Sequence, residues 1–130
     1  MIAVALLAAS ALTFNLVCVG NEDHDAKMTQ LLPPGRQMQS ATIPFRETYR
    51  INLEQRRWCR DTCARTEALV SVTRSDIIIE DNRSGEMRFS TVGRETGKYS
   101  SSFYLPNFVK VFQYGSCKRE PFTGFPRQKF

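Results

Sequence analysis

The sequence predicts an all-β fold: a small antiparallel β-barrel or sandwich of about seven short strands, locked by disulfides. Two observations predict it. Short runs of β-branched and aromatic residues recur along the chain, and turn-forming Gly, Pro, Asn and Asp separate them. Four cysteines, an even number, are spread over a chain of 130 residues, a length typical of one domain with a buried core. No run of ordinary helical length interrupts the pattern.

The first eleven residues, MIAVALLAASA, predict a signal peptide (1–11) that leaves a single mature domain, 12–130. The apolar run ends in Ala9-Ser10-Ala11, the small-x-small pattern that signal peptidase recognises, although no Lys or Arg precedes the run. A membrane anchor would need about 20 mainly apolar residues, and polar residues interrupt this run from Ser10 onward. We therefore expect no stable membrane span after cleavage. A lipid-modified Cys18 is disfavoured, because Asn15 stands three residues before it.

The clearest strand is expected at 45–53, where Phe45, Tyr49 and Ile51 alternate with polar residues. Glu47 falls on the apolar side of this alternation and is expected near the strand end. A second signal is the continuous β-branched run Ile77-Ile78-Ile79, typical of a strand that is buried on both faces or central in a sheet. The full set of expected strands is 13–20, 45–53, 68–72, 76–81, 86–92, 98–104 and 108–114.

Two segments lack this pattern. Residues 21–42 carry acidic residues, then Pro33-Pro34-Gly35 and polar residues, and predict a long mobile loop that holds His24, the only histidine. Residues 54–65 (EQRRWCRDTCAR) are polar apart from Trp58 and two cysteines, and predict a short helical turn or an irregular disulfide loop. In the aromatic tail 121–126, Phe122 and Phe125 are expected to cover one mouth of the barrel; the alternative is an exposed aromatic patch that contacts a partner.

The four cysteines predict two disulfides in an oxidising compartment, with three connectivities open. We favour Cys59–Cys63, which closes a local turn, together with Cys18–Cys117, which joins the first and last strands. A four-thiolate zinc site would need two C-x₂₋₄-C pairs, and only Cys59 and Cys63 have that spacing. A redox-active pair would more often be spaced C-x-x-C. No metal and no cofactor are expected.

The basic excess gives a formal charge of +5, and thirteen of the eighteen basic residues are Arg. Arg is suited to carboxylate and phosphate partners. The candidate anion or partner contact is the Arg-rich disulfide loop, composed of Arg56, Arg57, Trp58, Arg60 and Arg65. Arg beside an aromatic ring also suits nucleic acid, but the export signal and the local acids Glu54, Asp61 and Glu67 make nucleic acid an unlikely partner.

The segments FNLVCVG, YRINL, RRWCRDTC, GRETG and GSCKREPFTGFPRQKF together resemble a group of small exported four-cysteine proteins, mainly alphaproteobacterial and uncharacterised, with a C-terminal PFTGFP tail. The likeness covers most of 12–130 and is weakest over 21–42. The resemblance implies export to the periplasm or beyond and a disulfide framework. It implies no activity and no site residues.

The sequence favours a non-enzymatic protein. A hydrolase needs a nucleophile with a base, a carboxylate pair or a metal, and His24 stands alone in an expected loop. Asp76, Glu80 and Asp81 bracket a strand and are more simply solvated strand ends. We therefore expect a periplasmic or secreted binding or interaction protein whose partner is an anionic envelope component or an acidic protein. The alternative is an inhibitor of a secreted hydrolase such as a lysozyme or protease, with the disulfide loop or the tail as the insert.

Overall fold

The computed structural model describes residues 12–60, 63–82, 87–106 and 108–126; the expected signal peptide, 1–11, lies outside these ranges. The described chain is all-β, as the sequence predicts. Its strands are β1 (Thr13–Asp25), β2 (Ala41–Asn52), β3 (Arg57–Arg60), β4 (Glu67–Ala68), β5 (Ser71–Val72), β6 (Asp76–Asp81), β7 (Arg88–Gly93), β8 (Lys98–Tyr104) and β9 (Lys110–Glu120). Two short 3-10 helices, η1 (Lys27–Leu31) and η2 (Pro34–Arg36), lie between β1 and β2.

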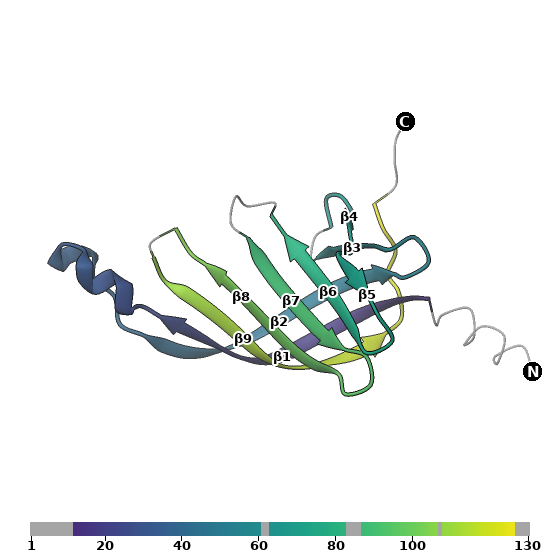
Figure 1. Ribbon diagram of the computed structural model, residues 1–130, viewed down its shortest axis with the longest axis horizontal. Helices are drawn as coiled ribbons and strands as arrows, with labels where there is room; N and C mark the ends of the chain where they lie inside the picture. Colours follow the sequence, from purple (N-terminus) through teal and green to yellow (C-terminus); the bar gives the residue numbers. More distant parts are fainter. Residues whose placement is uncertain (1–11, 61–62, 83–86, 107, 127–130) are drawn as a thin grey trace, which may run out of the picture.

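The strands form one antiparallel sheet in the order β4-β3-β2-β1-β9-β8-β7-β6-β5, which curls on itself into a half-barrel (Figure 1). The first strand therefore lies beside the last. The two edge strands, β4 and β5, are consecutive in the chain. The two residues between them form hydrogen bonds to both edges of the sheet. Leu69 N–H donates to the Arg56 carbonyl beside β3, and Val70 N–H donates to the Ile78 carbonyl of β6. Residues 67–72 thus join the two edges of the sheet.

The strand bounds differ from the expected ones in several places, among them β9, which continues to Glu120 instead of ending at 114. The expected strand 68–72 is two short strands, and 57–60, expected as turn or loop, is β3. The extended strands β1 and β2 run into the expected loop 21–42 from both sides, so that only 26–40 connects them. Alternation signals fail there because residues 21–25 and 41–44 are exposed or only partly buried, even where 21–25 pair with β9.

The concave face of the curled sheet holds the core. Alternate residues of each strand point into it, as pleating requires. Its buried cluster consists of Phe14, Leu16, Cys18, Phe45, Tyr49, Ile51, Trp58, Leu69, Ile77, Ile79, Val92 and Tyr99. Ile77 and Ile79 belong to it, whereas Ile78 is partly exposed on the other face, so β6 is buried on one face rather than on two.

Gly20 of β1 and Gly115 of β9 lie directly opposite each other in the sheet. A Cβ atom added to Gly20 would meet the Tyr114 carbonyl oxygen at 2.1 Å, and one added to Gly115 would meet the Val19 carbonyl oxygen at 2.0 Å. The backbones of β1 and β9 therefore approach more closely here than any side chain would allow. Glycine at both positions lets the sheet bend sharply at its centre.

All four cysteines are paired as favoured from the sequence, Cys18 with Cys117 and Cys59 with Cys63. None is free, so the thiolate zinc alternative does not hold. Disulfides of this kind persist in oxidising surroundings, so the fold points to an extracellular type of environment. Within the described ranges, no helix combines the length and apolar character needed to cross a bilayer.

The C-terminal segment 121–126 packs on the convex face rather than over a mouth of the sheet. Asn15 Nδ2 donates to Thr123 Oγ1 at 3.0 Å, and Thr123 N–H donates to Asn15 Oδ1 at 3.2 Å. Arg50 Nη1 donates to the Gly124 carbonyl at 3.2 Å. These contacts explain why Asn15, a polar residue on the outer side of β1, is buried.

Candidate functional site

The five residues of the expected Arg-rich contact site do not form one surface. Arg56 is exposed in the turn before β3, where it adopts a φ of 54°. Arg65 is exposed between β3 and β4 and pairs with Glu67 at 3.2 Å. Because Arg57 is opposite Ala68 in the β3–β4 pair, Arg56 and Arg65 lie at opposite ends of that pair. A contact of either residue with an anion stays a prediction.

The other three residues are engaged with the protein itself. Arg57 donates to the Thr66 side chain at 3.0 Å and to the Thr66 carbonyl at 2.6 Å. Trp58 is 0% exposed in the core, and its indole N–H donates to the Ala68 carbonyl at 3.3 Å. Arg60 turns toward the concave face, where it lies near Glu47 and Asp81. Trp58 is therefore not available to stack on a partner.

A charged network lies within the curled sheet, next to the apolar core. Glu47, in the middle of β2 rather than near a strand end, accepts a hydrogen bond from Arg88 Nη2 at 2.8 Å. Arg60 Nη1 lies 3.7 Å from Glu47 Oε2, and Arg60 Nη2 lies 3.4 Å from Asp81 Oδ2. Burial alone would lower the pKa of Arg88, but the neighbouring Tyr49 and Glu47 outweigh it and raise that pKa. The cluster balances its charges internally.

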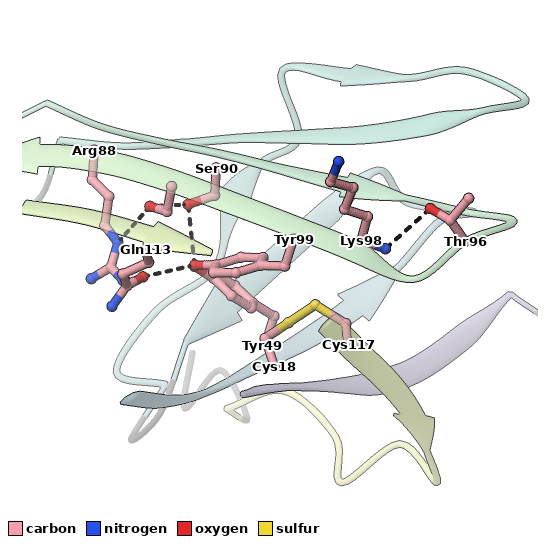
Figure 2. The surroundings of a disulfide bond; sticks show 10 residues. Cys18, Tyr49, Arg88, Ser90, Thr96, Lys98, Tyr99, Gln113 and Cys117 are labelled. Atoms are coloured by element: carbon pink, nitrogen blue, oxygen red, sulfur yellow. Dashed lines mark hydrogen bonds between the residues drawn. A yellow bond between two sulfur atoms is a disulfide. The ribbon is translucent and has the colours of Figure 1, made fainter. Parts of the chain in front are cut away.

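Hydroxyl and amide groups extend this network. Gln113 Oε1 accepts from Arg88 at 2.6 Å and from the Tyr99 hydroxyl at 3.1 Å (Figure 2). The Tyr49 and Tyr99 hydroxyl oxygens are 2.7 Å apart. Burial, and then the neighbouring Tyr99, raise the pKa of Tyr49 well above its ordinary value. Gln113 Nε2 donates to Glu22 at 3.1 Å, and Glu22 contacts His24. These side-chain hydrogen bonds link β1, β2, β7, β8 and β9.

A protruding segment, residues 26–40, is the most distinctive exposed feature, and we call it the hairpin tip. It carries η1 and η2 at the far end of β1 and β2, beyond the rest of the sheet (Figure 1). Its base is anchored, because Ala26 is buried against Val109 and Val111 of the β8–β9 hairpin. The Ala26 N–H also donates to Ser40 Oγ at 2.9 Å across the base.

Side-chain hydrogen bonds also fix the interior of the hairpin tip. Thr29 is fully buried; its hydroxyl donates to the Ala26 carbonyl at 2.6 Å and accepts from the Met38 N–H at 2.9 Å. Gln37 Nε2 lies within hydrogen-bond reach of the Gln30 carbonyl at 3.3 Å and the Leu32 carbonyl at 3.1 Å. Residues 26–40, the middle of the segment 21–42 expected as a mobile loop, thus contain two short 3-10 helices with side-chain hydrogen bonds between them and the flanking residues.

The surface of the hairpin tip is both apolar and cationic. Leu31 is 81% exposed, Met28 55% and Met38 45%. Lys27 and Arg36 are also exposed, and no Asp or Glu occurs between positions 26 and 40. The sequence contained this signal, since three large apolar residues stand among basic and polar ones with no acid, but the Pro-Pro-Gly motif made the segment look like an ordinary loop.

A comparison with family models, curated proteins and solved structures finds no match to this chain. In the part of the chain that the structure describes, no three His, Cys, Asp or Glu side chains come together in a way that could hold a metal ion. The arrangement of exposed groups is suited to binding. The hairpin tip can insert apolar side chains into an interface while its two cations contact anions beside it.

Proposed function

We propose that this chain is a non-enzymatic exported protein, periplasmic or secreted, that binds an anionic envelope component through the hairpin tip. The component we favour is an anionic lipid surface. The observation that carries the proposal is the combination of Met28, Leu31 and Met38, all exposed, with Lys27 and Arg36 on a segment that has no carboxylate.

The physical argument has two parts. Apolar side chains gain free energy on leaving water for the acyl boundary, about 0.8 kcal/mol per buried CH₂. A Lys or Arg close to an anionic leaflet adds about 1 kcal/mol. With two cations and three apolar side chains, the expected binding is reversible and salt-sensitive. Because Thr29 and Ser40 already fix the tip, little conformational entropy is lost on contact.

Sedimentation with vesicles tests the proposal. The oxidised protein should bind vesicles that contain phosphatidylglycerol, bind phosphatidylcholine vesicles weakly, and dissociate as salt rises. The double variant Met28→Ser/Leu31→Ser and the double variant Lys27→Gln/Arg36→Gln should each bind at least fivefold less. Met87→Ser, which removes an exposed apolar side chain outside the tip, is the matched control and should bind like the parent.

Two results would overturn the proposal. One is no binding to anionic vesicles at low salt. The other is equal binding by the parent and both tip variants, which would place any lipid contact elsewhere on the molecule.

An inhibitor of a secreted hydrolase is the second candidate, because a braced, protruding tip also suits insertion into an active-site cleft (Figure 1). A panel of lysozymes and proteases tests it. Inhibition that disappears in Met28→Ser/Leu31→Ser would favour this function, and full enzyme activity throughout the panel would remove it.

A further inference from the structure

A pocket opens at the end of the curled sheet opposite the hairpin tip. Its apolar walls are Phe14 and Leu16 at the start of β1, Ile77 of β6 and Val92 of β7. All four side chains are buried in the core. The turn between β7 and β8 and the end of β9 complete it. Neither the hairpin tip nor the charged network contributes a residue to this pocket.

The pocket has a volume of about 170 Å³. An apolar cavity of about 150 Å³ lined by Leu, Ile and Phe stays dry and accepts benzene. The pocket is therefore large enough for one phenyl ring or a branched aliphatic group of similar size.

Two guanidinium groups line the same pocket, Arg94 from the β7–β8 turn and Arg119 from β9. Arg94 Nη1 donates to the Thr73 carbonyl at 2.7 Å, which ties it to the β5–β6 turn. The Arg119 guanidinium carbon lies 4.4 Å from the centre of the Phe14 ring, so its charge is held over an apolar wall. Among the described residues, no carboxylate lines the pocket.

This combination defines a ligand chemistry. An apolar cavity with Arg at its rim favours a small apolar group that carries an anion, and the planar fork of Arg matches a carboxylate. A guanidinium has five N–H donors, so the bond from Arg94 to Thr73 leaves donors for a ligand. We propose that this pocket binds a small aromatic or branched aliphatic monocarboxylate, with the apolar group against Phe14, Leu16, Ile77 and Val92 and the carboxylate on Arg94 and Arg119.

NMR titration of the oxidised protein tests the site, with phenylacetate as the probe. Phenylacetate should shift the methyl signals of Leu16, Ile77 and Val92, and 2-phenylethanol, which has the ring but no charge, should bind at least tenfold more weakly. Arg94→Gln and Arg119→Gln should each weaken phenylacetate binding about tenfold. Arg46→Gln, an exposed position on β2 outside the pocket, is the matched control and should leave the affinity unchanged.

The carboxylate could belong to a free acid or to the C-terminus of a peptide, and two further probes distinguish these sources. Tighter binding of N-acetylphenylalanine than of phenylacetate, with loss of binding for its amide, assigns the site to a peptide C-terminus. The reverse order assigns it to a free acid.

The proposal is overturned if the three methyl signals do not move at high phenylacetate concentration, or if 2-phenylethanol binds as well as phenylacetate. It is also overturned if both Arg variants, folded with the parent melting temperature, keep the parent affinity. The vesicle assay on the hairpin tip is independent of all these outcomes, because Met28→Ser/Leu31→Ser leaves the pocket intact.

Discussion

Phe45 of β2 and Tyr99 of β8 meet ring to ring, with centroids 5.5 Å apart, although two strands separate them in the sheet. The residues between them in the same row are Gly20 and Gly115. The rings can close over these strands because neither glycine has a side chain. The row therefore places a bend in the sheet and an aromatic contact at the same point.

Gly115→Ala should consequently be among the most damaging single-methyl additions to this fold. The new Cβ would meet backbone atoms of β1 at 2.0–2.8 Å, and β1 cannot move without disturbing its pairing with β2. We expect a loss of about 3 kcal/mol in the free energy of unfolding, measured by urea denaturation. Gly35→Ala, where no atom lies within 4 Å of the new Cβ, is the control and should stay within about 0.5 kcal/mol of the parent.

The two disulfides should contribute unequally to stability. Cys18–Cys117 spans 99 residues and Cys59–Cys63 spans 4, so the chain-entropy model assigns about 4–5 kcal/mol to the first and about 2 kcal/mol to the second. Calorimetry should show a much larger fall in Tm for Cys18→Ala/Cys117→Ala than for Cys59→Ala/Cys63→Ala. Equal falls would mean that loop length does not govern the effect here.

The ion pairs inside the curled sheet should contribute more to the free energy of unfolding than the exposed pair does. Glu47→Ala removes the carboxylate that Arg88 and Arg60 share, and it leaves two cations largely out of water. We expect a loss of about 2–3 kcal/mol in unfolding free energy. Glu67→Ala, which breaks the more exposed pair with Arg65, is the comparison and should cost less than about 0.5 kcal/mol.

Ionisation of Tyr49 should lower the free energy of unfolding at alkaline pH. Because burial raises the pKa of Tyr49 in the folded state, the unfolded chain, with an ordinary tyrosine pKa near 10, releases this proton first. This contribution to stability is complete below about pH 10 and is lost as the pH rises above it. Tyr49→Phe should reduce the alkaline slope of unfolding free energy, and should cost about 1 kcal/mol at neutral pH through the lost contact with Tyr99. An unchanged slope would contradict the assignment.

Local patterns in the sequence were sufficient for the strands that cover the core. Phe45, Tyr49 and Ile51 alternate with polar residues along β2 and are all buried in the core, so their periodicity matches their burial. The same reasoning failed for Glu47, which sits mid-strand on the concave face. Its partners, Arg60 and Arg88, come from β3 and β7, and their proximity exists only once the sheet has curled.

The candidate binding sites were harder to predict for a related reason. Trp58 and Arg60 look like a surface pair because they stand among charged residues, but alternation along β3 turns both toward the concave face. The pocket at Arg94 and Arg119 joins a turn to a strand end 25 positions later in the chain. No sequence pattern around Arg94 or Arg119 predicts that the two residues lie close together.

The pairing of β1 with β9 also sets the order in which the molecule is completed. The first strand has one neighbour as soon as β2 is made, but its second neighbour, β9, follows all the other strands in the sequence. Until β9 is present, a hydrogen-bonding edge of β1 stays vacant and the curl cannot close. Folding is therefore expected to be a late, whole-chain event governed by long-range contacts, and removal of residues 110–120 should leave an aggregation-prone fragment rather than a smaller stable domain.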